Sequence, residues 1–119
     1  MTKIISWVEI PATDIYRAVK FYNSLLGLKL EILDFGEEKM ACFPGDEGAI
    51  SQSPGFNPGK DGSLISLNTG LGLEKAIERI PDLGGSVLKG KTKIEAEGRG
   101  YFALFTDSEG NKVGLYGDE

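Results

Sequence analysis

The hydrophobic and polar positions of the first half of the chain predict a strand, a helix and three further strands. Residues 3–10 are rich in β-branched and aromatic side chains, which favours a strand. Over residues 15–26, apolar residues recur mainly at spacings of three and four, the pattern of an amphipathic helix with one buried stripe. Thr13 or Asp14 can cap this helix and Gly27 can end it. Shorter extended runs follow at 28–33, 38–43 and 48–52.

The same order begins again after residues 53–62, a segment with two prolines and three glycines that is typical of a linker. A strand is expected at 64–69 and a helix at 73–83. Pro81 should distort the last turn of that helix, because proline removes a backbone donor. Three strands are then expected at 86–89, 99–106 and 111–116.

The sequence itself also repeats. Residues 41–48 align with residues 103–110 at an offset of 62, and Leu26-Gly27 aligns with Leu83-Gly84 at an offset of 57. An internal repeat constrains a whole fold more strongly than the propensity of any one segment. We therefore expect one α+β domain over residues 1–119. It should contain two tandem βαβββ units, at 1–52 and 63–119.

The composition narrows the choice of partners and location. The net charge is −5 and no basic segment is present, so a nucleic acid is a poor candidate partner. No apolar run is long enough for a membrane span, and the N-terminus lacks the pattern of a signal peptide. Cys42 is the single cysteine and cannot form an internal disulfide, so we expect a cytoplasmic protein.

Histidine is absent from the chain. Its absence removes the commonest general base and the commonest ligand of transition metals. Ser-His-Asp triads, Cys-His dyads and histidine-based zinc sites are therefore excluded.

Two motifs and several pairs between them carry a resemblance to a known family. They are residues 7–14 (Trp-Val-Glu-Ile-Pro-Ala-Thr-Asp), Arg17-Ala18, Phe21-Tyr22, Leu26-Gly27, and residues 100–111 at the end. Over essentially its whole length the chain resembles the vicinal-oxygen-chelate superfamily of glyoxalases, bleomycin resistance proteins and dioxygenases. It is most similar to a small bacterial branch described as enzymes related to lactoylglutathione lyase. The resemblance implies a curved mixed sheet around a cavity, with the helices outside.

The resemblance also indicates where a metal would bind. Metal-dependent members take ligands from the first and fourth strands of each half. The corresponding positions here are Trp7, Gln52, Leu64 and Gly114. Only Gln52 has a side-chain oxygen, and one neutral amide cannot hold a divalent ion. We expect no metal and no other cofactor, although Glu9 could join Gln52 in an unusual site.

The alternation of side chains along a strand predicts what else faces the cavity. Glu9 should share a face with Trp7, where burial would raise its pKa and suit it to be a general base or the partner of a cationic ligand. Alternatively, it forms a salt bridge with Lys112 or Arg99. Trp7 either stacks on a ligand or fills the core.

Further candidates for contact with a ligand lie on the later strands. Ser66 and Asn68 should face the cavity with Leu64, and Tyr116 should face it with Gly114, whose missing side chain leaves room for an indole or a ligand. Gln52, expected to face inward with Ile50, offers a donor and an acceptor or is simply solvated.

Arg99 and Tyr101 could form an anion-binding pair at the cavity mouth, or Arg99 is simply a solvated turn residue. Cys42 reads as a small buried hydrophobe rather than a nucleophile.

Three functions fit this description. The first is a metal-independent lyase, isomerase or epimerase that acts on a small organic molecule with Glu9 as base. The second is a protein of the bleomycin-resistance type that sequesters a ligand without chemistry. The third is a ligand-sensing or purely structural partner. The family resemblance further implies a homodimer.

Overall fold

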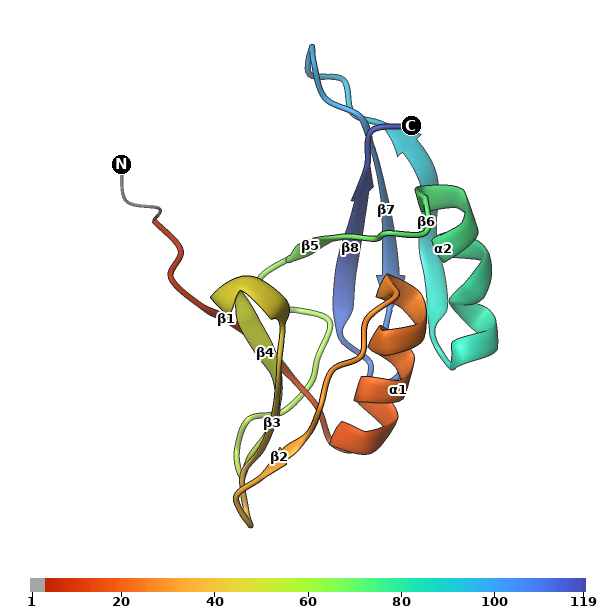
Figure 1. The fold of residues 1–119 in the computed structure, drawn as a ribbon. Coiled ribbons are helices and arrows are strands. Elements are labelled where there is room, and N and C mark those ends of the chain that lie inside the picture. Colours follow the sequence, from red (N-terminus) through yellow and green to blue (C-terminus); the bar gives the residue numbers. More distant parts are fainter. Residues whose placement is uncertain (1–3) are drawn as a thin grey trace.

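The structure is a computed structural model that describes residues 4–119 (Figure 1). The first three residues, which include the predicted start of the first strand, lie outside the described part. In the first half the elements are β1 (Val8–Pro11), α1 (Ile15–Leu26), β2 (Leu33–Asp34), β3 (Lys39–Cys42) and β4 (Gly48–Gln52). In the second half they are β5 (Ser66–Asn68), α2 (Leu73–Arg79), β6 (Ser86–Lys93), β7 (Tyr101–Thr106) and β8 (Lys112–Gly117).

The strand order confirms the predicted duplication. Among the described residues the strands form two four-stranded sheets, ordered β1-β4-β3-β2 and β5-β8-β7-β6. In each half the first strand runs parallel to the fourth, and the other neighbours are antiparallel. The fold is therefore α+β, with two βαβββ units, as the sequence predicts.

The helix boundaries follow from local chemistry. The Asp14 side chain accepts hydrogen bonds from the amides of Tyr16 and Arg17 at the start of α1. Gly27 ends the helix with φ at 70°, in the left-handed region that suits glycine. Helix α2 ends at Arg79, and Pro81 begins a short 3-10 turn, Pro81–Leu83, as expected for a proline that cannot donate to the previous turn.

The strand predicted at 28–33 is wrong for most of its length, since only Leu33 belongs to β2. The side chain of Asn23 accepts a hydrogen bond from the Leu30 amide at 2.8 Å and donates one to its carbonyl. These bonds replace the partners that a neighbouring strand would supply. The leucines Leu28 and Leu30 still pack against the core from this irregular segment.

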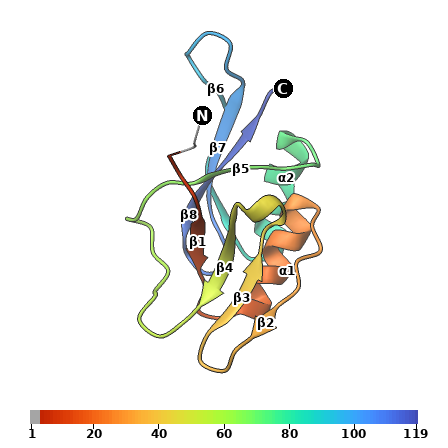
Figure 2. The same ribbon diagram turned by 60° about the vertical axis from the view of Figure 1, so that its left-hand side comes forward.

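The helices cover one face of each sheet and leave the other face open (Figure 2). In the first sheet Ile10, Ala41 and Ile50 lie in register and are almost completely buried. In the second sheet Leu115 and Ala103 occupy the same kind of position. α1 and α2 lie next to each other on this side of the molecule (Figures 1 and 2).

A buried polar network joins the two halves. The Tyr22 hydroxyl donates to Asp107 Oδ2 at 2.6 Å, and the Asn111 side-chain amide donates to the same oxygen at 3.0 Å and to the Pro11 carbonyl at 2.8 Å. Burial, followed by the nearby Asp107 carboxylate, raises the pKa of Tyr22 well above its usual value. Phe21 stacks on Phe105 beside this network.

Glu109 forms a second link between the halves at the start of α1. Its fully buried side chain accepts hydrogen bonds from the amides of Thr13 and Asp14 and from the guanidinium of Arg17. Burial alone would raise the pKa of Glu109, but the bonds from Arg17, the Asp14 amide and Ser108 together hold it below its ordinary value. The motif residues of the sequence thus hold the halves together.

Of the helices in residues 4–119, none is long and apolar enough to cross a membrane.

Candidate functional site

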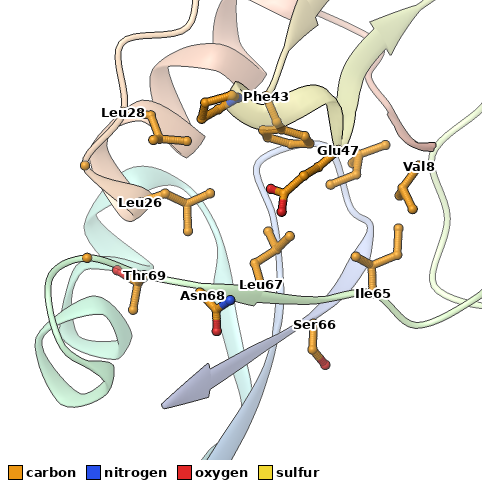
Figure 3. A pocket seen from close by; sticks show the side chains of 14 residues that line it. Val8, Leu26, Leu28, Phe43, Glu47, Ile65, Ser66, Leu67, Asn68 and Thr69 are labelled. Atoms are coloured by element: carbon orange, nitrogen blue, oxygen red, sulfur yellow. The ribbon is translucent and has the colours of Figure 1, made fainter. Parts of the chain in front are cut away.

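A cavity of about 610 Å³ lies between the two halves, at the C-terminal end of α1 (Figure 3). Its walls come from β1, from the segment that follows α1, from the turn before β4, and from β5 and its flanks. The lining residues are Val8, Ile10, Leu26, Gly27, Leu28, Phe43, Pro44, Glu47, Ile65, Ser66, Leu67, Asn68, Thr69 and Gly70. A volume of this size and a largely apolar lining are typical of sites for small organic molecules.

Glu47 supplies the charged group of this lining, and Figure 3 shows its carboxylate pointing into the cavity between Phe43 and Leu67. The backbone there is fixed against β1. The Glu47 carbonyl accepts a hydrogen bond from the Val8 amide at 3.1 Å. A Cβ on Gly48 would lie only 2.0 Å from the Val8 carbonyl oxygen, so glycine is required at this close approach.

The surroundings of Glu47 favour a cationic ligand. The ion pairs of residues 4–119 are Arg17–Glu109, Lys39–Asp34 and Lys91–Glu74, and none involves Glu47. No lysine or arginine lines the cavity among the described residues. A ligand with an apolar body and one positive charge would therefore contact the walls and neutralise the carboxylate.

The polar groups on the opposite wall come from β5 and its flank. The Thr69 hydroxyl donates to the Leu25 carbonyl and accepts from the Leu71 amide, so it is already committed to the protein. Ser66 and Asn68 complete the polar part of the lining. Among residues 4–119, Glu47 is the one carboxylate, and the one charged side chain, in the lining.

The residues predicted to face a shared cavity lie mostly elsewhere. Of the predicted ligand contacts in the described part of the chain, Ser66 and Asn68 line this cavity and the others do not. Trp7 and Leu64 are 41% and 53% exposed, so neither fills the core. Arg99 is exposed outside the cavity, and the Tyr101 ring lies under the ammonium groups of Lys91 and Lys93, at 4.6 and 5.3 Å.

The repeat offset predicts that Gln52 faces inward, and this prediction is wrong. The reason is the length of a hairpin. Six residues, 43–48, separate the paired Cys42 and Ala49, whereas nine, 105–113, separate the paired Leu104 and Gly114. A difference of three residues turns the following strand over, because side chains alternate between faces. Gln52 Oε1 instead accepts a hydrogen bond from the Ile15 amide at 2.8 Å, at the start of α1.

Glu9 lies in β1 in register with Ala49, and the prediction that it is enclosed is wrong, because the residue is exposed. Its carboxylate accepts a hydrogen bond from the Ser51 hydroxyl at 2.7 Å. Neither Lys112 nor Arg99 pairs with it within 4 Å among the residues described. The burial expected for Glu9 is therefore missing in the single chain.

Three smaller expectations also change. The space beside Gly114 is not free for an indole or a ligand, since a Cβ there would lie 2.6 Å from Ser66 Oγ. The Tyr116 hydroxyl accepts from the Gly100 amide and donates to Asp118, so it is bound within the protein. Cys42 is exposed on the open face rather than buried.

The residues do not fit the family's metal site. Of the four corresponding positions, Trp7, Leu64 and Gly114 provide no oxygen donor, and the oxygen of Gln52 is committed to the α1 backbone on the opposite face. Within residues 4–119, no group of three or more aspartate, glutamate or cysteine side chains lies close enough together to hold an ion.

Sequence reasoning missed Glu47, Phe43 and Leu28. The segment 44–48 carries turn residues and was interpreted only as a turn. The cavity forms because this turn lies opposite β5, a contact between halves that the local pattern does not contain. No signal within the single sequence marks Glu47 as a cavity residue.

Comparison with known proteins decides the family. A "Glyoxylase-like domain-containing protein" from Didymella fabae is 34% identical over 116 residues, covering 90% of this chain and 88% of that protein. The chain belongs to the glyoxalase-like family. Residues 5–45 of this glyoxalase-like protein also match the model described as "Bleomycin resistance protein-like N-terminal".

Solved structures share the fold of the glyoxalase-like chain. Hypothetical protein SA1046 from S. aureus matches with a TM-score of 0.67 and 17% identity, over 98% of this chain and 97% of that one. A glyoxalase I mutant from Zea mays matches with a TM-score of 0.67 and 21% identity, over 94% of this chain and 45% of that one. The fosfomycin resistance protein FosX from Listeria monocytogenes matches with a TM-score of 0.66 and 18% identity, over 100% of this chain and 94% of that one.

Proposed function

We propose that this glyoxalase-like protein binds a small organic cation in the cavity between its halves and holds it without chemical change. The observation that carries the proposal is the Glu47 carboxylate, which forms no ion pair with residues 4–119 and points into a largely apolar cavity of about 610 Å³. The match of residues 5–45 to a bleomycin-resistance-like model supports a binding role. The net charge of −5 also favours the approach of cations.

A metal-independent lyase or isomerase that uses Glu9 as base is the alternative. The relationship to a glyoxalase-like protein favours this alternative. Against it, Glu9 is absent from the lining of the main cavity. Binding without reaction is therefore the function that the geometry supports best.

A homodimer remains part of the proposal. Ile4, Ile5 and Trp7 are large hydrophobic residues that are 100%, 67% and 41% exposed in the single chain, next to the edge strand β1. A second copy of the chain would cover this apolar segment. Sedimentation equilibrium should give twice the monomer mass, and a monomer at all concentrations would contradict the proposal.

The test of binding compares two ligands of the same shape. Benzyltrimethylammonium carries a positive charge, and its carbon isostere neopentylbenzene does not. Titration calorimetry of the wild-type protein, Glu47→Gln and the control Glu38→Gln should show about tenfold weaker binding of the cation to Glu47→Gln, for a loss of about 1.4 kcal/mol. The control should bind like wild type, because Glu38 is exposed at a hairpin and lines none of the cavity.

The neutral isostere should be insensitive to Glu47→Gln. A larger side chain in the cavity, in Leu28→Trp, should weaken both ligands by occupying the space they need. Equal cation affinity for wild type and Glu47→Gln would refute the role of the carboxylate. Unchanged binding of both ligands by Leu28→Trp would refute the location.

A further inference from the structure

A second cleft, of about 330 Å³, lies at the seam between the two sheets. It is formed by β1, the start of β8 and the linker, which Figure 2 shows on the side of the molecule away from the helices. Ile10 and Ile65 line both this cleft and the main cavity, so these two side chains form part of the wall between them. The cleft is therefore a separate compartment, with chemistry of its own.

The cleft contains one charge of each sign. Glu9 contributes a carboxylate from β1, and Lys112 contributes an ammonium group from β8. They form no ion pair with each other or with another described residue within 4 Å. One oxygen of Glu9 is held by the Ser51 hydroxyl at 2.7 Å, which fixes the carboxylate while leaving its charge unneutralised.

The remaining lining of the cleft is mixed. Pro11, Val113 and Phe56 of the linker add apolar side chains to the two isoleucines, and Asn57 and Ser63 add polar ones. The linker is tied to β8 because the Gly59 amide donates to Asn111 Oδ1 at 3.1 Å. The side-chain amide of Asn111 donates hydrogen bonds to the Pro11 carbonyl and to Asp107, so it has no donor left for a ligand in the cleft.

We propose that this cleft binds a small zwitterion, a free amino acid with an apolar side chain. The ammonium group of the ligand lies at Glu9, its carboxylate lies at Lys112, and its side chain contacts Ile10, Ile65 and Phe56. A ligand with a single charge would leave either Glu9 or Lys112 without a partner. The recognition therefore depends on both charges together, unlike that of the Glu47 cavity.

Three forms of one ligand test this requirement. L-Leucine carries both charges, leucine amide only the positive charge, and N-acetyl-leucine only the negative charge. NMR titration should show shifts at Glu9, Phe56 and Lys112 with leucine. Each singly charged form should bind about tenfold more weakly, the effect of losing one charge-assisted contact of about 1.4 kcal/mol.

Charge-removing variants complete the test. Glu9→Gln keeps an acceptor for Ser51. It should weaken the binding of leucine about tenfold and leave the binding of N-acetyl-leucine unchanged. Lys112→Met should also weaken the binding of leucine about tenfold, and it should leave the binding of leucine amide unchanged. The control is Lys20→Met, on the exposed face of α1, which should bind leucine normally. Equal affinity for the three ligands, or no shifts up to the solubility limit of leucine, would overturn the proposal. Failure of the Glu47 test leaves this result unaffected, since the two experiments use different variants and ligands.

Discussion

Replacing Glu109 should destabilise the protein because its carboxylate joins the β7–β8 turn to the start of α1. The side chain is fully buried and accepts from the amides of Thr13 and Asp14 and from Arg17. Glu109→Ala removes all these bonds. Glu109→Gln keeps an oxygen for the amides and removes only the charge, so the two variants separate hydrogen bonding from electrostatics.

The magnitude follows from the exposure of the donors. A hydrogen bond to a charged group contributes about 1.5–3 kcal/mol when it is buried. Arg17 is 52% exposed and the Thr13 amide is accessible to water, so solvent replaces part of what is lost. We expect Glu109→Ala to lower the free energy of unfolding by about 2–3 kcal/mol. Glu109→Gln should lower it by about 1 kcal/mol, because a half-exposed ion pair contributes at most about that much. The control Glu97→Gln, in an exposed loop, should change the free energy of unfolding by less than about 0.5 kcal/mol.

The charge also predicts a pH dependence. The pKa of Glu109 is lowered by folding from its ordinary value of 4.5. Its charge therefore contributes stability that is fully present above about pH 5 and is lost as the pH falls through the lowered pKa. Urea unfolding at pH 7 should show the wild type about 1 kcal/mol more stable than Glu109→Gln, and this difference should shrink towards pH 3. An equal difference at both pH values would refute an electrostatic role for Glu109.

The remaining predictions concern positions where the structure fixes a single contact. Tyr22→Phe should lower the free energy of unfolding by about 2 kcal/mol because buried Asp107 loses a donor, whereas Tyr16→Phe, at an exposed position, should have no effect in the same urea experiment. Gly114→Ala should cost about 1–2 kcal/mol because its Cβ would meet Ser66 Oγ at 2.6 Å, and adding Ser66→Ala should recover most of that loss; simple additivity would contradict the contact. Gln52→Ala should lower the free energy of unfolding by about 1 kcal/mol, because the Ile15 amide loses its hydrogen bond. The variant should not alter the response of the melting temperature to Zn²⁺ or Mn²⁺. A metal-dependent stabilisation that is lost in this variant would show that Gln52 is a ligand after all.

The parts of the fold that were predictable depend on residues with strong local effects. Asp14 caps α1 and Gly27 ends it with a left-handed backbone, where the sequence predicts these ends. α2 ends at Arg79, before the predicted end at 83, because Pro81 lacks a backbone donor and begins a 3-10 turn. The segment 28–33 shows the limit of this reasoning. Its apolar residues suit a strand, but the side chain of Asn23 takes the backbone groups that pairing would need.

The site was predictable only in part. Alternation within β1 predicts that Glu9 and Ile10 lie on opposite faces, and Ile10 is buried whereas Glu9 is exposed. The environment of Glu9 depends on segments far away in the sequence, and that is where the reasoning failed. Glu47 was missed for the same reason, since its cavity exists only when its turn meets β5.

The three extra residues in the second hairpin have a consequence for protein engineering. A donor placed at position 52 would always point towards α1, however favourable its chemistry. The open face of β4 is reached at Ala49 and Ser51, which lie in register with Glu9 and Pro11. Anyone who wishes to install a metal centre in this chain should therefore begin at Ala49, where space must first be made because the residue is completely buried.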